Sequence, residues 1–212
     1  MHRVDDEVVV RTRADGATEL RVNGVFVMDD VETSSERVLA ERALASGARE
    51  VLVGGLGLGF TADALLRPAD GPGVERLVVA ELHREVVDAV RDGAGAGPAV
   101  LDDPRCDVVV GDVLAVLDAQ PDASLDAVLL DVDNGPDFLV HDTNADVYAA
   151  AGIARCTRVL RPGGTLAVWS MADSAPLRAA LAAVLDDVEA VPVPVRLQGR
   201  DEHYWVLSGR AR

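Results

Sequence analysis

The stretch from Glu50 to Leu66, EVLVGGLGLGFTADALL, restricts the possible folds of this chain more than any other. It joins an apolar run suited to a buried parallel strand, a glycine-rich turn and the start of a helix. Such a unit brings backbone N–H groups and a helix N-terminus up to a nucleotide-like ligand. The stretch therefore predicts an α/β protein with a ligand at this turn. The alternative is a purely conformational role, in which the glycines only end the strand.

The spacing of the glycines indicates which nucleotide fits. The dinucleotide fingerprint reads G-x-G-x-x-G, whereas Gly55, Gly57 and Gly59 occupy every second position and Phe60 stands where the last glycine is expected. This departure counts against NAD and against an NAD-dependent oxidoreductase. A G-x-G-x-G turn after the first strand resembles the motif of class I S-adenosylmethionine-dependent transferases. We therefore expect these three glycines to belong to the cofactor site.

The composition narrows the class of partner. The chain has 212 residues and a net charge of −16, so no basic face of the size that nucleic acid needs is expected. The N-terminal residues are acidic where a signal peptide would be apolar, and no apolar run approaches the length of a membrane span. Cys106 and Cys156 are spaced like neither a metal site nor a disulfide framework. We expect a soluble cytoplasmic protein with a small-molecule acceptor and no metal, nucleic acid or membrane partner.

The chain divides into two regions with different patterns. Residues 1–32 are β-rich and broken at Ala14-Asp15-Gly16 and at Asn23-Gly24, which predicts a small β-hairpin appendage. Residues 33–212 are predicted to form a Rossmann-like, S-adenosylmethionine-binding domain that begins with a helix over 33–45. In this domain, predicted strands alternate with predicted helices: strands over 51–53, 76–80, 107–110, 125–130 and 166–169, and helices over 61–66, 84–91, 113–117, 145–160 and 175–185.

The end of the chain breaks this alternation. Strands over 188–197 and 203–208 are joined by Gln198-Gly199-Arg200-Asp201, a loop suited to an antiparallel hairpin. Strand–helix alternation followed by such a hairpin predicts an α/β fold with a seven-stranded, mostly parallel sheet and an antiparallel last strand. This arrangement resembles the class I methyltransferase fold.

Carboxylates follow three of the predicted strands. In an open α/β sheet, ligands bind outside the carboxyl ends of the strands. Glu81 comes about twenty residues after the glycine turn, where a carboxylate accepts hydrogen bonds from a ribose diol. Asp112 can accept from an adenine amine, cap the next helix, or do both. Asp131 and Asp133 follow the fourth strand and are candidates for proton acceptance, with turn formation as the alternative.

Five segments together resemble one family. In order they look like the spermidine synthase family of polyamine aminopropyltransferases, over residues 23–170. The segments read GGLGLGF, VVAELHREVVDAVR, LDDPRCDVVVGDVLAVL, LDAVLLDVDNGP and VLRPGGTLAVWS. The resemblance implies that Asp131 is the catalytic carboxylate, which accepts a proton from an amine nucleophile. It also implies that a sulfonium nucleoside or the attacking group contacts Gly55, Gly57, Glu81, Asp112 and Asp131.

Two segments depart from the pattern of that family. Polyamine enzymes have a Gln before, and a Tyr-His pair within, the segment that here reads VETSSERVL, and this chain has Ser34, Ser35 and Glu36 there instead. In DVDNGP, the second acid of the family is either displaced to Asp133 or replaced by Asn134. Asp133 is therefore the second catalytic candidate after Asp131.

These departures decide which reaction is expected. Because the amine-binding residues have changed while the nucleoside motifs have not, we expect methyl transfer from S-adenosylmethionine to a small acceptor. Aminopropyl transfer from decarboxylated S-adenosylmethionine is the alternative, and a non-catalytic nucleoside-binding or scaffolding protein is a second one. Tyr148 and Trp169 are candidates for the wall of the acceptor pocket. The exposed edges of the N-terminal hairpin favour pairing into a homodimer.

Overall fold

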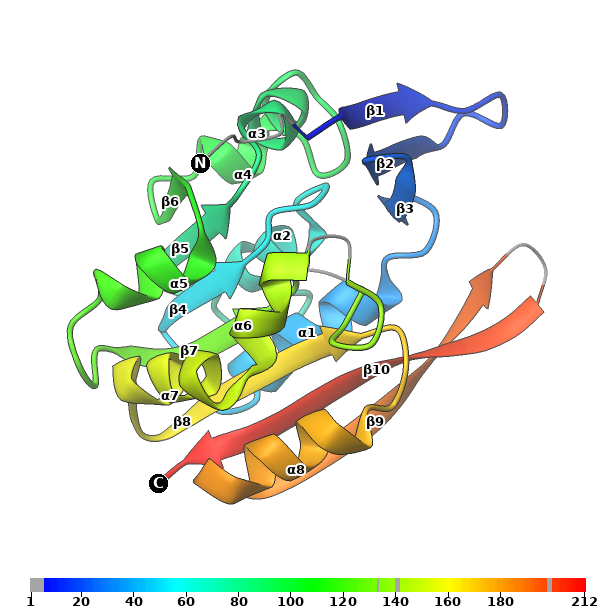
Figure 1. Cartoon of the computed structure of the whole chain (residues 1–212). Helices are drawn as coiled ribbons and strands as arrows, with labels where there is room; N and C mark the ends of the chain where they lie inside the picture. Colours follow the sequence, from blue (N-terminus) through cyan, green and yellow to red (C-terminus); the bar gives the residue numbers. More distant parts are fainter. Residues whose placement is uncertain (1–5, 133, 140–141, 198–199) are drawn as a thin grey trace.

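The main feature of the fold is one seven-stranded sheet with the strand order β6-β5-β4-β7-β8-β10-β9 (Figure 1). The computed structural model describes residues 6–132, 134–139, 142–197 and 200–212. Strand order reverses between β4 and β7, and ligands bind at such switch points in open α/β sheets. The strands are β4 (Glu50–Gly54), β5 (Arg76–Glu81), β6 (Cys106–Val110), β7 (Leu125–Leu130), β8 (Leu160–Ser170), β9 (Leu185–Leu197) and β10 (Arg200–Ala211).

The strand directions agree with the predicted class I methyltransferase fold. β4 pairs in parallel with β5 and β7, and the parallel pairing continues outward to β6 on one side and β8 on the other. β10 runs antiparallel to both β8 and β9. The expected antiparallel last strand is therefore confirmed.

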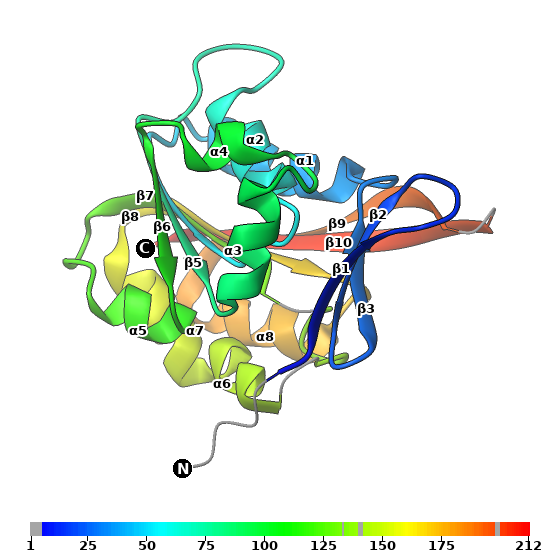
Figure 2. The same cartoon turned by 90° about the horizontal axis from the view of Figure 1, so that it is seen from above.

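Helices cover both faces of this sheet, as the view from above shows (Figure 2). One layer contains α1 (Ser34–Leu44), α2 (Phe60–Leu66), α3 (Arg84–Arg91) and α4 (Pro98–Leu101). The other contains α5 (Val113–Asp118), α6 (Ala145–Tyr148), α7 (Ala150–Val159) and α8 (Ala175–Val184). Because both faces are covered, the inner strands are apolar runs rather than alternating ones, and Val51, Leu52 and Val53 are all fully buried.

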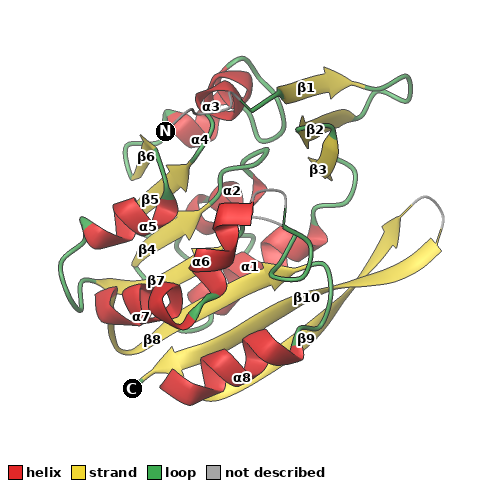
Figure 3. Cartoon of the chain, in the orientation of Figure 1, coloured by secondary structure: helices red, strands yellow, loops and turns green. Residues whose placement is uncertain are grey.

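The N-terminal region forms a separate three-stranded antiparallel sheet of β1 (Val8–Thr12), β2 (Thr18–Val22) and β3 (Val25–Asp29). Figure 3 shows it beside the ends of the main-sheet strands rather than as an extension of that sheet. Asn23 and Gly24 both have positive φ values, as the predicted Asn-Gly hairpin turn requires. Leu20 joins the same apolar core as α1 and β4. The division into residues 1–32 and 33–212 stays a prediction.

Three local features differ from the expected elements. The single helix predicted over 145–160 is two helices, because Ala149 adopts an extended conformation with ψ 161°. The short helix α4, which begins at Pro98, lies between α3 and β6, where no helix was predicted. In β8, Leu160 pairs with Leu125 and Thr165 with Ala127, so residues 161–164 bulge out of the sheet. The predicted hairpin loop at Gln198 and Gly199 lies outside the described residues.

Within the described residues, no helix is long and apolar enough to cross a membrane.

The Asp126 side chain connects β7 to β4 and β8 by hydrogen bonds, at the end of the sheet opposite to the glycine turn. Its Oδ2 accepts hydrogen bonds from the backbone N–H groups of Arg49 and Glu50, both at 2.9 Å, and its Oδ1 accepts one from Arg161. Burial raises the pKa of Asp126, but these donors outweigh it and hold that pKa below the usual range.

We expect Asp126→Asn to lower the free energy of unfolding by about 1–3 kcal/mol near neutral pH, because charge-assisted hydrogen bonds are lost. The folded-state pKa of Asp126 is depressed, so its contribution is present above the unfolded pKa and disappears as pH falls through the folded value. Urea denaturation of both proteins across the acidic range measures this difference. A stability difference that persisted at the lowest pH would contradict the assignment.

Candidate functional site

A pocket lies where the carboxyl ends of β4, β5, β6 and β7 meet the N-terminal sheet. It contains about 930 Å³ of empty space, its open mouth included. Apolar residues of β2 and β3 form one wall: Leu20, Val22, Val27 and Met28. The glycine turn and the strand-end carboxylates also line the pocket.

Gly55 is where the turn comes closest to the neighbouring strand. Its φ is +90°, and a Cβ atom placed on it would lie 2.0 Å from the carbonyl oxygen of Asp131. Backbone hydrogen bonds hold the turn on both sides: Gly55 N–H donates to Ala80, and Asp131 N–H donates to Gly54, each at 2.8 Å. Only glycine fits here, because a side chain would have no space and an unfavourable backbone conformation.

The other two predicted glycines differ in position. Gly57 lines the pocket, with φ +53°, and a Cβ atom there would lie 2.6 Å from the sulfur of Met28. The same sulfur accepts a hydrogen bond from the N–H of Leu58 at 3.2 Å, so β3 contacts the turn directly. Gly59 is the N-cap of α2 in a left-handed conformation and faces Ala96 instead of lining the pocket. Its effect on the site is through the shape of the turn.

Glu81 is buried at the end of β5, with 6% of its surface exposed. Its Oε2 accepts a hydrogen bond from Leu56 N–H in the glycine turn, and its Oε1 accepts one from His83 N–H, each at 2.8 Å. Oε2 has a second lone pair and can still accept a hydrogen bond from a ligand hydroxyl, whereas Oε1 also faces the ring Nδ1 of His83 at 3.5 Å. The carboxylate is thus held in place while it lines the pocket.

Asp112 caps α5, as one of its two expected roles requires. Its Oδ1 accepts from the N–H groups of Leu114 and Ala115 at 2.8 and 3.1 Å. The residue also lines the pocket, and its Oδ2 accepts no hydrogen bond from the described part of the chain. Capping therefore leaves one oxygen available to a ligand.

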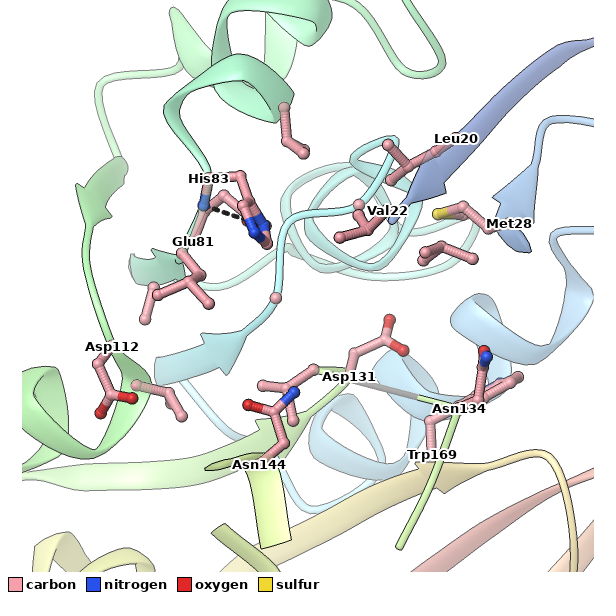
Figure 4. A pocket seen from close by; sticks show the side chains of 18 of the residues that line it. Leu20, Val22, Met28, Glu81, His83, Asp112, Asp131, Asn134, Asn144 and Trp169 are labelled. Carbon is pink, nitrogen blue, oxygen red and sulfur yellow. Dashed lines mark hydrogen bonds and ion pairs between the residues drawn. The ribbon is translucent and has the colours of Figure 1, made fainter. Parts of the chain in front are cut away.

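Asp131 lies directly after β7 and faces the middle of the pocket (Figure 4). Its Oδ2 accepts a hydrogen bond from the hydroxyl of Thr61 in α2 at 2.9 Å. Burial raises the pKa of Asp131, and the Thr61 hydroxyl only partly opposes this. A carboxylate whose pKa is raised toward neutrality is a better proton acceptor for chemistry near pH 7.

The residues after Asp131 are only partly described. Asp133, the second catalytic candidate, lies outside the described residues, so its role stays a prediction. Asn134 is buried and lines the pocket, and its Nδ2 approaches the carbonyl of Phe26 at 3.4 Å. Trp169, at the end of β8, also lines the pocket, whereas Tyr148 is buried but is not among the lining residues.

Two ionisable groups of the pocket were not predicted from the sequence. Glu36, in the first turn of α1, is 7% exposed and lines the cavity. His83 lies 3.5 Å from Glu81 and 3.2 Å from Asp6, measured from its two ring nitrogens. Glu36 belongs to VETSSERVL, a segment that departs from the family pattern, and this departure was the sequence feature that could have indicated its role. For His83 the sequence shows only that Glu81 is two residues away, whereas its second partner, Asp6, is brought next to it by the fold.

The pocket has two ends with different chemistry. Glu81, His83 and Asp112 lie at one end, and Asn134 and Trp169 lie at the other, with Asp131 between them (Figure 4). The first end offers carboxylates and backbone suited to hydroxyl and amine donors of a nucleoside. The second end is bounded by an aromatic ring and by the start of α1. A ligand with a nucleoside and a side arm fits this division.

Comparisons with known proteins give consistent results. A polyamine aminopropyltransferase of Mycobacterium tuberculosis is 34% identical over 172 residues, 79% of this chain and 31% of that protein. One of Nitrosomonas europaea is 32% identical over 183 residues, 82% of this chain and 53% of that protein. Putrescine N-methyltransferase 4 of Nicotiana tabacum is 30% identical over 120 residues, 56% of this chain and 28% of that protein. The chain therefore spans about half or less of these relatives.

Solved structures show the same fold. A spermidine synthase in complex with the transition state analogue AdoDATO superposes with a TM-score of 0.80 over 99% of this chain and 72% of that one, at 14% identity. Spermidine synthase from Thermotoga maritima gives 0.79 over 99% and 70%, at 13% identity. No family model matches the chain.

The energetic effect of the close contact at Gly55 can be measured by comparison with Gly16, which has the same φ but no neighbouring atoms. We expect Gly55→Ala to lower the free energy of unfolding by about 3 kcal/mol, from backbone strain plus the collision with Asp131. Gly16 also has φ +90° but has no atom within 4 Å, so Gly16→Ala should lose only about 1 kcal/mol. Thermal or urea denaturation measures both. Equal losses would show that the contact has no energetic effect.

The pH dependence of stability tests His83. The hydrogen bond to Glu81 raises the pKa of His83 most, and Asp6 adds to this against the opposing effect of burial. Because the folded pKa is raised, the stabilisation is fully present below the unfolded value of about 6.5 and is lost as pH rises through the folded value. We expect His83→Gln to destabilise the protein more at pH below about 6.5 than in alkaline solution. Urea denaturation at both pH values measures this, and an equal loss would refute it.

Proposed function

The chain belongs to the spermidine synthase-like family within the class I S-adenosylmethionine-dependent methyltransferase fold, and on this basis we propose that it is a sulfonium-nucleoside transferase. The proposed reaction is transfer of an aminopropyl group from decarboxylated S-adenosylmethionine to a small amine. The main support is the match to polyamine aminopropyltransferases across about four-fifths of the chain.

This proposal reverses the order expected from the sequence. Methyl transfer was placed first because amine-binding residues of the family are missing from VETSSERVL and DVDNGP. The comparisons favour aminopropyl transfer instead, since the relatives matched over most of the chain carry that name. Methyl transfer remains the second candidate, favoured by the shorter match to putrescine N-methyltransferases.

The pocket fits the nucleoside part of such a donor. Gly55 lines the pocket because, without a side chain, the turn can pack against the backbone of Asp131, and Glu81 Oε2 has a lone pair available for a ribose hydroxyl. Asp112 offers Oδ2 to an adenine amine. Gly57 also exposes its backbone to the cavity, and Gly59 affects the site through the conformation of the turn. These assignments are proposals for the cofactor-binding residues.

The chemistry requires alignment and removal of one proton. A sulfonium nucleoside supplies an activated carbon and leaves as a neutral thioether, so the protein does not have to create the electrophile. Asp131 accepts a hydrogen bond from the attacking amine, orients its lone pair and takes its proton as the new C–N bond forms. The N-terminal sheet covers the pocket with apolar side chains and excludes water from the reacting groups. Asp133 is proposed as a second acid near the acceptor.

Two further expectations belong to this proposal. Pairing of two chains through the N-terminal sheet would cover one of its outer strands, β1 or β3. A cytoplasmic location agrees with a substrate that is a small intracellular metabolite. A sedimentation experiment on the purified chain tests the first expectation.

Replacement of Asp131 tests the proposed reaction. With decarboxylated S-adenosylmethionine and a panel of small amines, we expect the wild-type chain to release methylthioadenosine and form the aminopropylated amine, both detected by mass spectrometry. Asp131→Asn should retain nucleoside affinity within about twofold and lower turnover by roughly 10²- to 10⁴-fold, because the proton acceptor is lost.

The control for this variant is Asp137→Asn, an exposed acid of the same loop, which should leave turnover unchanged. Product formation with S-adenosylmethionine but not with its decarboxylated form would show methyl transfer and would contradict aminopropyl transfer. Full activity of Asp131→Asn would exclude the carboxylate as the proton acceptor.

A further inference from the structure

Thr61 is a buried polar residue beside the pocket. It lies in the first turn of α2 and is only 2% exposed. Its Oγ1 donates a hydrogen bond to Oδ2 of Asp131 at 2.9 Å, because an ionised carboxylate can only accept. Thr61 is not among the residues that line the pocket. Any effect of Thr61 on a ligand must therefore act through Asp131.

The backbone of Asp131 is held independently of Thr61. Its N–H donates to the carbonyl of Gly54 at 2.8 Å, and its own carbonyl lies against Gly55, where a Cβ atom would come within 2.0 Å of the oxygen. Only the torsions of the side chain remain free. A hydrogen bond to one carboxylate oxygen restricts them, and a bond to an ionised acceptor is stronger than one between neutral groups. Thr61 therefore fixes the direction of the carboxylate.

The two carboxylate oxygens of Asp131 differ in what they contact. Oδ2 accepts the hydrogen bond from Thr61, whereas Oδ1 accepts none from the described part of the chain. The side chain faces the middle of the pocket (Figure 4). Because burial already penalises the ionised carboxylate, an N–H or O–H group of a ligand at Oδ1 would be stabilising.

The hydroxyl of Thr61 also affects the proton affinity of Asp131. Burial raises the pKa of this carboxyl, and the hydrogen bond from Thr61, which stabilises the charged form, lowers it. The other ionisable residues that line the described pocket are Glu36, Glu81, His83 and Asp112. The charge of Asp131 contributes, after burial, to raising the pKa of Glu36 on α1. Without the Thr61 hydroxyl, Asp131 would keep its proton to a higher pH.

We propose that Thr61 is a positioning residue for the transfer reaction: its hydroxyl holds Oδ2 of Asp131, so that Oδ1 is the oxygen that takes the proton of the attacking amine. This inference rests on the proposed function. In the step itself, the nitrogen lone pair attacks the carbon bound to the sulfonium, the C–N bond forms, and the C–S bond breaks with its electron pair on sulfur. One N–H proton moves to Oδ1, which leaves a neutral amine product and a neutral thioether.

A purely structural role of Thr61 is the competing explanation. In that case the hydroxyl only joins α2 to the end of β7, and its removal would lower stability and would change turnover by the same factor at every pH. A positioning role predicts instead a shift of the pH dependence, because the group that accepts the proton is itself altered. The two explanations therefore differ in the shape of the pH profile.

The test is the pH profile of kcat for aminopropyl transfer by the full chain and by variants of Thr61. Thr61→Val and Thr61→Ala remove the hydroxyl, whereas Thr61→Ser retains it. Because the carboxylate must be ionised to accept the proton, we expect both removals to move the acidic midpoint upward by about one pH unit. Below this midpoint kcat should fall about tenfold. Thr61→Ser should stay within about threefold of the wild type at every pH, since its hydroxyl can still donate.

The matched control is Thr165→Val in β8. Thr165 is 4% exposed and its hydroxyl has no hydrogen-bonding partner in the described ranges, so this variant loses a buried threonine hydroxyl that does not contact Asp131. Its pH profile should match that of the wild type. The affinity for methylthioadenosine, measured by calorimetry, should stay within about twofold in every variant, because neither threonine lines the pocket.

A second readout follows the carboxyl group without any turnover. Carbon NMR of protein labelled at the aspartate side-chain carboxyl groups records the titration of Asp131, and Asp131→Asn identifies its signal by removing it. We expect the pKa of Asp131 to rise in Thr61→Val by about as much as the kinetic midpoint. Thr165→Val should leave that pKa unchanged.

The outcomes separate this inference from the proposed function. If the wild type transfers the aminopropyl group while Thr61→Val and Thr61→Ala keep its kinetic midpoint and the pKa of Asp131, the role of Thr61 is structural and the inference is overturned alone. A wild type that binds no adenosyl ligand and forms no product would overturn the proposed function, and the inference with it.

Discussion

The contact between Gly55 and the backbone of Asp131 determines the geometry of the site. At this point the glycine turn rests on the end of β7, and hydrogen bonds from Gly55 to Ala80 and from Asp131 to Gly54 join three strands. Glu81 and Asp131 are thereby positioned relative to the same turn. Because a closely packed sheet yields little, a substitution that disturbs this contact would displace both carboxylates together.

The order of strands and helices was predictable because each element has a local signal. Apolar runs marked the parallel strands, and the Asn-Gly dipeptide marked a hairpin. The break between α6 and α7 depends instead on packing. A Cβ atom at Gly152 would lie 2.3 Å from the carbonyl oxygens of Asp146 and Val147, so the two helices approach closely there. A glycine inside a helical pattern was the one local sign of this break.

The site was predictable only where it follows from topology. Glu81, Asp112 and Asp131 meet because parallel strands end at the same edge of the sheet. Glu36 and the wall formed by Leu20 and Met28 come from the N-terminal third of the chain, and their positions depend on how that region packs over the edge. No spacing rule connects them to the glycine turn. From the sequence, Glu36 in VETSSERVL indicates only that residues typical of the family are missing, whereas the fold makes Glu36 part of the pocket.

The two backbone hydrogen bonds to Glu81 have a consequence for the free energy of association. A flexible glutamate loses rotamer freedom when a ligand immobilises it, which costs on the order of 1 kcal/mol. Here Leu56 and His83 have already fixed the carboxylate, so that loss occurs during folding. Ligands that hydrogen-bond to Glu81 meet a rigid acceptor. Their affinity is then limited by desolvation and by the ordering of their own side arm, rather than by the protein.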